Sequence, residues 1–246
     1  MTPLARILLC LALALPAAAP APTRADVTGA PDLIDTDRAA ELTAIARLRR
    51  AEATTGGCTA VLVAPSAALT AAHCLARPRD RVLILDPTGP NRMVTAITDS
   101  ELHPTYDPAL QNRVEGYVND LALLHLATPV PPEVARPMPL AAPAALDETI
   151  AHATFGYVNR RAIGLGSTDA LRGHTPCPAV SLEEGPIASP CAVAGGQSGG
   201  AFVHMTDTGP VLVGLLVSNF GRDGLNSLIS PVTPADWPAL AEALAE

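Results

Sequence analysis

Residues 195–201 read Gly195-Gly196-Gln197-Ser198-Gly199-Gly200-Ala201, so one serine is enclosed by four glycines. An apolar run from Val211 to Val217 follows. Glycine lets the backbone come close to a bound group and turn its N–H donors toward it, as an attacking serine requires. The same residues could also form a flexible hairpin loop. Whether Ser198 is a nucleophile therefore depends on finding a base and an acid elsewhere in the chain.

A candidate base lies at the end of an apolar segment. Between Cys58 and Cys74 the sequence indicates two short buried strands, with a turn at Pro65-Ser66 and His73 directly after the second strand. A bond between the two cysteines would join the start of this hairpin to its end and hold His73 in place. Because an unperturbed imidazole titrates near neutrality, His73 could take up a proton and return it.

A candidate acid precedes another core strand. Asp120 stands immediately before the apolar stretch from Leu121 to Leu126. An aspartate at this point is either a surface residue in a turn or a buried acid with a partner. This stretch alone leaves both alternatives open.

The composition limits the available chemistry. The chain has 246 residues and a formal net charge of −8, and all 16 of its basic residues are arginine. Without lysine, a serine–lysine hydrolase, a Schiff-base enzyme and a lysine-bearing phosphate loop are excluded. The sequence has neither acidic tails nor basic blocks, so we expect no nucleic-acid partner. We also expect no metal and no cofactor.

The N-terminus has the three zones of a secretory signal. Arg6 precedes an apolar run from Ile7 to Leu15, and small residues follow. The run is too short to span a bilayer, so we expect no stable membrane insertion. Cleavage after Ala18 or after Ala25 would fit. Residues 1–25 are therefore interpreted as a signal peptide with a short leader, and the mature protein as secreted or periplasmic.

Four cysteines remain in the exported part: Cys58, Cys74, Cys177 and Cys191. An even number in an oxidising setting indicates two disulfides. Three pairings exist, and nearness along the chain favours Cys58–Cys74 and Cys177–Cys191. A zinc site is the alternative, but the sequence contains no Cys-x-x-Cys pair and no neighbouring histidine pair.

Short apolar stretches separated by glycine and proline turns indicate an all-β protein, either a sandwich or a pair of barrels. Residues 131–145 are rich in proline and alanine, so we expect an extended connector there. This divides the exported chain into an N-terminal part, 26–130, and a C-terminal part, 146–246. We expect a terminal helix from Pro234 to Ala245, with Trp237 and Leu240 facing the body.

Three segments, in this order, resemble trypsin/chymotrypsin-type serine peptidases, in particular their bacterial secreted branch. They are Thr70-Ala-Ala-His73-Cys74, Asn119-Asp120-Leu-Ala-Leu-Leu and Gly196-Gln-Ser198-Gly-Gly. The likeness covers nearly the whole exported chain. It implies two antiparallel six-stranded β-barrels followed by a C-terminal helix, and a monomer that acts on polypeptide substrates.

The resemblance also implies the role of each residue. Ser198 would be the nucleophile, His73 the general base, and Asp120 the acid that orients the imidazole. The backbone amides of Gly196 and Ser198 would form the oxyanion hole. Together these roles describe a secreted endopeptidase that works through an acyl-enzyme.

The sequence departs from the family pattern at two places. Most members have an aspartate immediately before the nucleophile, which pairs with a new N-terminus after activation, whereas this chain has Gln197. We expect the oxyanion loop to be set by hydrogen bonds, without zymogen cleavage. The specificity pocket would be formed by Ala192, Ser218, Phe220 and Gly221, and an uncharged residue is expected before the scissile bond because Ala192 is not an acid.

Two other functions compete with this interpretation. The first is a peptidase-fold protein that binds peptides without turning them over, since Gln197 and the shortened pocket could disturb the site. The second is an esterase on the same fold, which differs from a peptidase only in its substrate.

Overall fold

The computed structural model describes residues 31–33, 40–54, 56–77, 80–111, 113–141, 152–159, 170–182, 185–222 and 225–245. The proposed signal peptide, residues 1–25, lies outside them. Within the described part no helix is long and apolar enough to cross a membrane.

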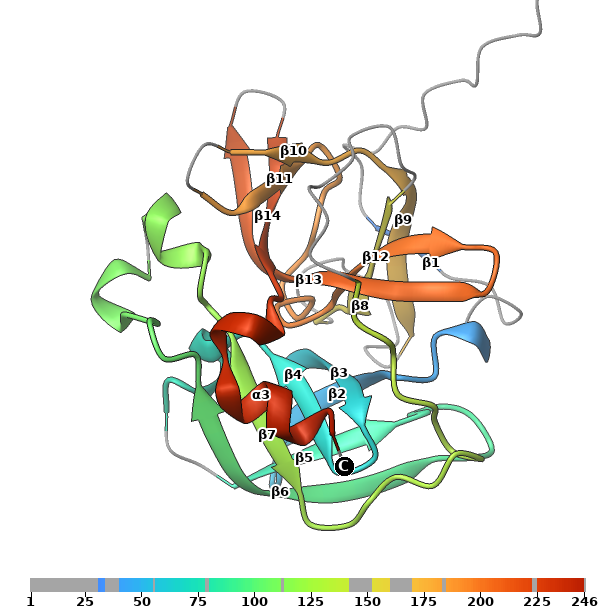
Figure 1. Cartoon of the computed structure of the whole chain (residues 1–246). Helices are drawn as coiled ribbons and strands as arrows, with labels where there is room; N and C mark the ends of the chain where they lie inside the picture. Colours follow the sequence, from blue (N-terminus) through green and yellow to red (C-terminus); the bar gives the residue numbers. More distant parts are fainter. Residues whose placement is uncertain are drawn as a thin grey trace, which may run out of the picture.

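The first half forms a closed antiparallel barrel with the strand order β2-β3-β4-β7-β6-β5 (Figure 1). Most of these strands are rich in apolar residues whose buried side chains fill the barrel interior, whereas β6 is largely exposed. The strands are β2 (Ile45–Arg50), β3 (Cys58–Ala64), β4 (Ala67–Thr70), β5 (Arg81–Leu85), β6 (Met93–Leu102) and β7 (Ala122–Leu126).

The second half forms most of an antiparallel sheet with the order β1-β9-β8-β12-β13-β14-β11-β10, to which the N-terminal part of the chain contributes the edge strand β1. Two strands of two residues each, β1 (Asp32–Leu33) and β10 (Val180–Ser181), stand at its ends. The sheet therefore has eight strands where six were expected. The other strands are β8 (His152–Tyr157), β9 (Leu171–Cys177), β11 (Ile187–Ser189), β12 (Ala201–Thr206), β13 (Gly209–Arg222) and β14 (Leu225–Pro231).

The all-β class is thus confirmed, with one difference beside the candidate base. Strand β4 ends at Thr70, and His73 lies in a short 3-10 helix, η1 (Ala72–Leu75), rather than at the end of the strand. The turn brings Cys74 back toward β3, where Cys58 begins the hairpin.

The proline-rich segment makes hydrogen bonds with both halves (Figure 1, yellow-green). The Met138 amide donates to Leu62 O of the first barrel at 2.9 Å, and Pro139 O accepts from the Leu212 amide of the second sheet at 2.8 Å. Proline leaves few backbone donors, and two of those that remain, the amides of Met138 and Ala141, donate to the first barrel and to the second sheet. The segment therefore lies as a strap between the halves.

The chain ends in a 3-10 turn, η4 (Pro234–Asp236), and the helix α3 (Pro238–Ala243), which is shorter than expected. Trp237 and Leu240 are buried, as predicted. Both belong to one continuous cluster of buried apolar side chains that includes residues of the first barrel and of the second sheet. The helix thus packs the end of the chain into a core that the two halves share.

Candidate active site

His73 and Asp120 meet in the structure. His73 Nδ1 lies 2.6 Å from Asp120 Oδ2, and the His73 backbone amide donates to Asp120 Oδ1 at 2.9 Å. The Asp120 side chain is 1 % exposed and that of His73 is 20 % exposed. The carboxylate is therefore sealed from water while the ring stays accessible. Of the two alternatives for Asp120, the structure has the buried acid with a partner.

The backbone around Asp120 is held from two sides. Asp120 O accepts a hydrogen bond from the Ala72 amide, and Leu121 O accepts one from the His103 amide. Tyr106 lies close enough for the Asp120 charge to act on it. Burial chiefly, with smaller contributions from the charges of Asp120 and Asp107, raises the pKa of Tyr106 above its ordinary value. Its phenol therefore stays neutral beside the acid.

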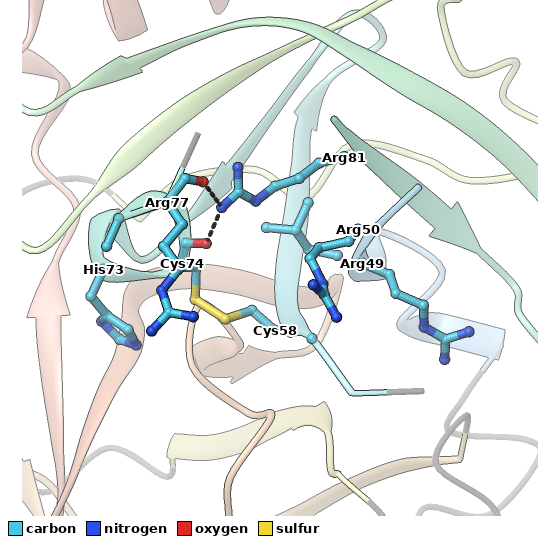
Figure 2. Close-up of a pocket in the computed structure, with 10 residues that line it drawn as sticks. Arg49, Arg50, Cys58, His73, Cys74, Arg77 and Arg81 are labelled. Atoms are coloured by element: carbon cyan, nitrogen blue, oxygen red, sulfur yellow. Dashed lines mark hydrogen bonds between the residues drawn. A yellow bond between two sulfur atoms is a disulfide. The ribbon is translucent and has the colours of Figure 1, made fainter. Parts of the chain in front are cut away.

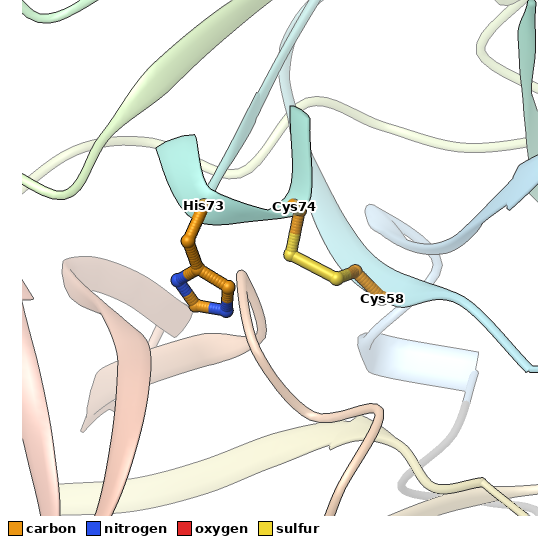
Figure 3. A group of neighbouring side chains, drawn as sticks. All are labelled: Cys58, His73 and Cys74. Atoms are coloured by element: carbon orange, nitrogen blue, oxygen red, sulfur yellow. A yellow bond between two sulfur atoms is a disulfide. The ribbon is translucent and has the colours of Figure 1, made fainter. Parts of the chain in front are cut away.

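The Cys58–Cys74 disulfide fixes the turn that carries His73 (Figure 2). In Figure 3 the imidazole and the disulfide project from the same side of η1. The ligand atoms of Cys58, His73 and Cys74 lie within 4.8 Å of one another, but both sulfurs are bonded to each other and offer no thiolate to a metal. The second predicted pair, Cys177–Cys191, is also a disulfide.

Ser198 lies against this disulfide from the other half of the molecule. Its carbonyl oxygen accepts a hydrogen bond from the Thr59 amide at 2.8 Å and lies 3.9 Å from Cys74 Sγ. The loop of residues 194–200, which carries the predicted nucleophile and is called the nucleophile loop below, therefore packs on Cys74, the residue next to His73. Within the described residues the Ser198 hydroxyl makes no hydrogen bond, to His73 or to any other group. Bonds between a nucleophile and its base are often long before a substrate binds.

Two amides of the nucleophile loop are left free to bind a ligand. Over the described residues, neither Gly196 N nor Ser198 N donates a hydrogen bond, whereas Gln197, Gly199 and Gly200 each donate one to a carbonyl group. Gly195 O accepts from the Asn159 amide at 2.6 Å. Because a planar trans peptide points its C=O and N–H in opposite directions, the Gly196 amide faces away from Asn159.

Glycine is required at position 196 for two reasons. Its φ is +104°, a conformation that residues with a side chain rarely adopt. A Cβ there would also lie 2.8 Å from both Asn159 N and Tyr157 O. A side chain at this position would therefore displace the free amide.

Gln197 is a structural member of the loop. It is 1 % exposed, its Oε1 accepts from the Ala194 amide at 2.8 Å, and its Nε2 donates to Arg172 O at 3.1 Å. A neutral amide can do both at once because it carries an acceptor and a donor, whereas a carboxylate could only accept. The side chain thus ties the loop to β9.

Thr59 connects the first barrel to the nucleophile loop, a role that the sequence analysis missed. Its hydroxyl donates to Gly196 O at 2.9 Å and accepts from the Tyr157 amide at 2.9 Å. The side chain is fully buried. Threonine is common in strands because it is β-branched, so the sequence of β3 did not indicate that the Thr59 hydroxyl would bind the nucleophile loop.

Arg47 makes a second link between the two halves that the sequence analysis missed. It is completely buried and donates to Asn159 Oδ1 at 2.7 Å and to Gly56 O at 2.9 Å. Asn159 in turn holds Gly195 O through its amide. Because β2 carries three arginines, Arg47, Arg49 and Arg50, nothing in the sequence indicated that Arg47 would form this link.

A cavity of about 180 Å³ opens beside Ser198. Most of the residues that line it are not those predicted for the specificity pocket. Of the four predicted pocket residues, only Ser218 is among the described residues that line it; the side chain of Phe220 lies outside the described part. Val193, Leu216 and Val217 give the cavity apolar walls. Its described lining is Val193, Ala194, Gly195, Ser198, Leu216, Val217, Ser218 and Asn219.

Comparison with known proteins agrees with this arrangement. The trypsin family model matches residues 36–237, which is well over half of the chain and includes both halves of the fold. No curated protein matches the chain. The extent of this match shows that the chain belongs to the trypsin family of serine-type hydrolases.

Proposed function

We propose that this protein is an endopeptidase in which Ser198 is the nucleophile, His73 the general base and Asp120 the orienting acid. The observation that carries the proposal is the buried Asp120 carboxylate bonded to His73 Nδ1. This bond places the ring proton on Nδ1 and leaves Nε2 as the proton acceptor.

The reaction would proceed in two halves. His73 Nε2 takes the Ser198 proton as the hydroxyl attacks the scissile carbonyl, and the free amides of Gly196 and Ser198 hold the resulting oxyanion. His73 then gives the proton to the leaving amine, which departs and leaves an acyl-enzyme. Water, activated by the same histidine, hydrolyses the ester and frees Ser198.

We further propose that the site needs no zymogen cleavage. The two hydrogen bonds of Gln197 support this, because they hold the loop without a charged N-terminus. Enzyme that begins anywhere from Ala19 to Asp26 should then be active as isolated. Activity that appears only after further trimming would reject this proposal.

The apolar walls of the cavity beside Ser198 favour an uncharged residue before the scissile bond. A peptide library should show cleavage after such residues, and a strong preference for arginine would contradict it. Export to a periplasm or to the outside fits the two disulfides, which form in oxidising compartments. We expect the exported enzyme to act as a monomer on polypeptides.

A fluorophosphonate probe tests the catalytic assignment. The wild-type protein should be labelled, whereas the Ser198→Ala and His73→Ala variants should not, with circular dichroism showing that all three are folded. Unlabelled wild-type protein, assayed separately, should cleave an unfolded protein substrate. Folded wild type that takes no label would indicate the peptide-binding alternative. Wild type that does react with the probe, but whose unlabelled form hydrolyses only simple esters, would indicate the esterase.

A further inference from the structure

A second cavity, of about 350 Å³, has His73 in its lining (Figure 2). The Cys58–Cys74 disulfide forms part of its wall, and four arginines line it: Arg49, Arg50, Arg77 and Arg81. It shares no lining residue with the cavity beside Ser198. The two cavities are thus separate neighbours, because Cys74 lines one, Ser198 lines the other, and Cys74 Sγ lies 3.9 Å from Ser198 O.

The charge of this cavity is opposite to that of the whole molecule. The chain has a formal net charge of −8 and 16 basic residues, of which four line this one cavity. No carboxylate is among the described residues of its lining. Clefts lined by one sign of charge concentrate ligands of the opposite sign.

The four arginines differ in how freely they can meet a ligand. Arg81 donates to Cys74 O at 2.9 Å and to Arg77 O at 2.8 Å, so its guanidinium is fixed in the wall. Arg49 is buried, and its side chain points away from the disulfide (Figure 2).

Arg77 and Arg50 remain available to a ligand. Their guanidinium groups lie on either side of the disulfide in Figure 2. Arg77 is exposed. The Arg50 side chain is half exposed, and its 3.6 Å contact with Glu52 is a surface ion pair that water and salt weaken.

We propose that this cavity binds an acidic side chain of the substrate on the leaving-group side of the scissile bond. The inference rests on the proposed peptidase function. If the residue before the cut fills the apolar cavity beside Ser198, the chain after the cut must run away from it, past His73 and over the disulfide. There Arg77 and Arg50 offer planar, paired donors to an aspartate or glutamate carboxylate within the first few positions.

Paired peptides test this directly. Each pair has the same residues before the cut and carries either Glu or Gln at one of the three positions after it. For wild type, kcat/KM should be about three- to tenfold higher for the Glu peptide at the favoured position, the range expected for one or two partly exposed ion pairs. This ratio should fall as salt is raised from about 0.05 to 0.5 M, because salt screens such pairs.

Three variants locate the effect. Arg77→Gln should reduce the Glu-to-Gln ratio, and the double variant Arg50→Gln/Arg77→Gln should bring it close to one. Arg92→Gln, which removes an exposed arginine outside the cavity, should keep the wild-type ratio.

The outcomes separate this inference from the proposed function. Wild type that cleaves both peptides of every pair equally, or that shows an acid preference which survives in the double variant, would overturn the acidic subsite and leave the peptidase assignment intact. Cleavage of none of the peptides would also overturn the subsite. Failure of the fluorophosphonate labelling would overturn the peptidase itself.

Discussion

At the scale of single residues, Thr59 shows how the first barrel acts on the chemistry of the second half. Its amide donates to Ser198 O, its hydroxyl donates to Gly196 O and accepts from Tyr157 N, and its carbonyl accepts from the Thr70 hydroxyl. Every polar group of this buried residue is thus used, and two of its bonds end on the nucleophile loop.

Replacement of Thr59 by valine should therefore affect both stability and turnover. Valine keeps the shape but leaves the Tyr157 amide without its buried acceptor, so the free energy of unfolding should fall by about 1–3 kcal/mol. Because Gly196 O also loses its donor, kcat should fall more than KM rises. Urea unfolding and steady-state kinetics measure the two effects. Thr59→Ser, which keeps the hydroxyl, should recover most of both.

The sequence was most informative about residues whose chemistry is rare. A serine among glycines, a histidine beside a cysteine and an aspartate before a core strand stand out, and the predicted contact of His73 with Asp120 is present in the structure. The contribution of Thr59 and Arg47 comes from long-range hydrogen bonds, and no local pattern marks which threonine or arginine will form them. The pocket lining was equally hard to predict because it depends on how β13 turns beside the loop.

At the scale of elements, the short strand β1 is attached close to the nucleophile loop. Asp32 and Leu33 pair with Gly173 and Arg172 of β9, and the Arg172 side chain donates to Pro31 O at 3.1 Å. The carbonyl of the same Arg172 accepts from Gln197. Arg172 therefore connects β1 directly to Gln197 of the nucleophile loop.

Removal of β1 should lower activity without unfolding the protein. A chain that begins after Leu33 leaves the β9 edge unpaired and loosens the anchor of Gln197, so kcat should fall severalfold compared with a chain that begins at Asp26. Fluorophosphonate labelling rates on the two proteins provide the measurement, with circular dichroism as the control for folding. Equal rates would show that β1 plays no part in setting the loop.

The docking of the C-terminal helix depends on a buried histidine. The His103 ring packs edge-on against Trp237, with 5.2 Å between ring centroids. Burial lowers the pKa of His103 below its ordinary value, and the charge of Asp236 opposes this shift only in part. The folded protein therefore favours the neutral ring.

Stability should consequently fall as the pH drops below about 6.5, the ordinary pKa of histidine. Below that value the unfolded chain binds a proton that the folded protein resists, and the loss is complete once the pH passes the folded pKa. Its size is on the order of 1 kcal/mol for each unit by which the pKa is lowered. Thermal unfolding followed by fluorescence of Trp237, the single tryptophan, should show this loss, and His103→Asn should reduce it. If the stability of the wild type fell no more steeply with decreasing pH than that of His103→Asn, His103 would not be the cause of the loss.

At the scale of the whole molecule, the two halves are joined through one core. The largest cluster of buried apolar side chains contains Leu62 and Leu69 of the first barrel, Phe155 and Leu215 of the second sheet, and Trp237. The all-β class followed directly from the sequence, since its short apolar stretches and turns are local signals. The shared core and the two added edge strands did not, because both depend on contacts between distant segments.

We therefore expect the protein to unfold in a single step. Loss of one half would expose the apolar surface of the other, so neither should persist alone. Trp237 fluorescence and far-ultraviolet circular dichroism should give coincident urea curves. Two separate transitions would show that the halves are independent.

Each disulfide closes a loop within its own half, so among the described residues only the backbone joins the barrel that carries His73 to the sheet that carries Ser198, once through the proline-rich strap and once through the chain that leads from β1 to β2. A protease cut placed in that strap would yield two fragments held together by noncovalent contacts alone, among them the β1–β9 pairing and the hydrogen bonds of Thr59 and Arg47. The rate of hydrolysis would then depend on the concentration of the two fragments. Dilution would separate them and abolish activity, and concentrating them again would restore it, so activity would report how tightly the two halves associate.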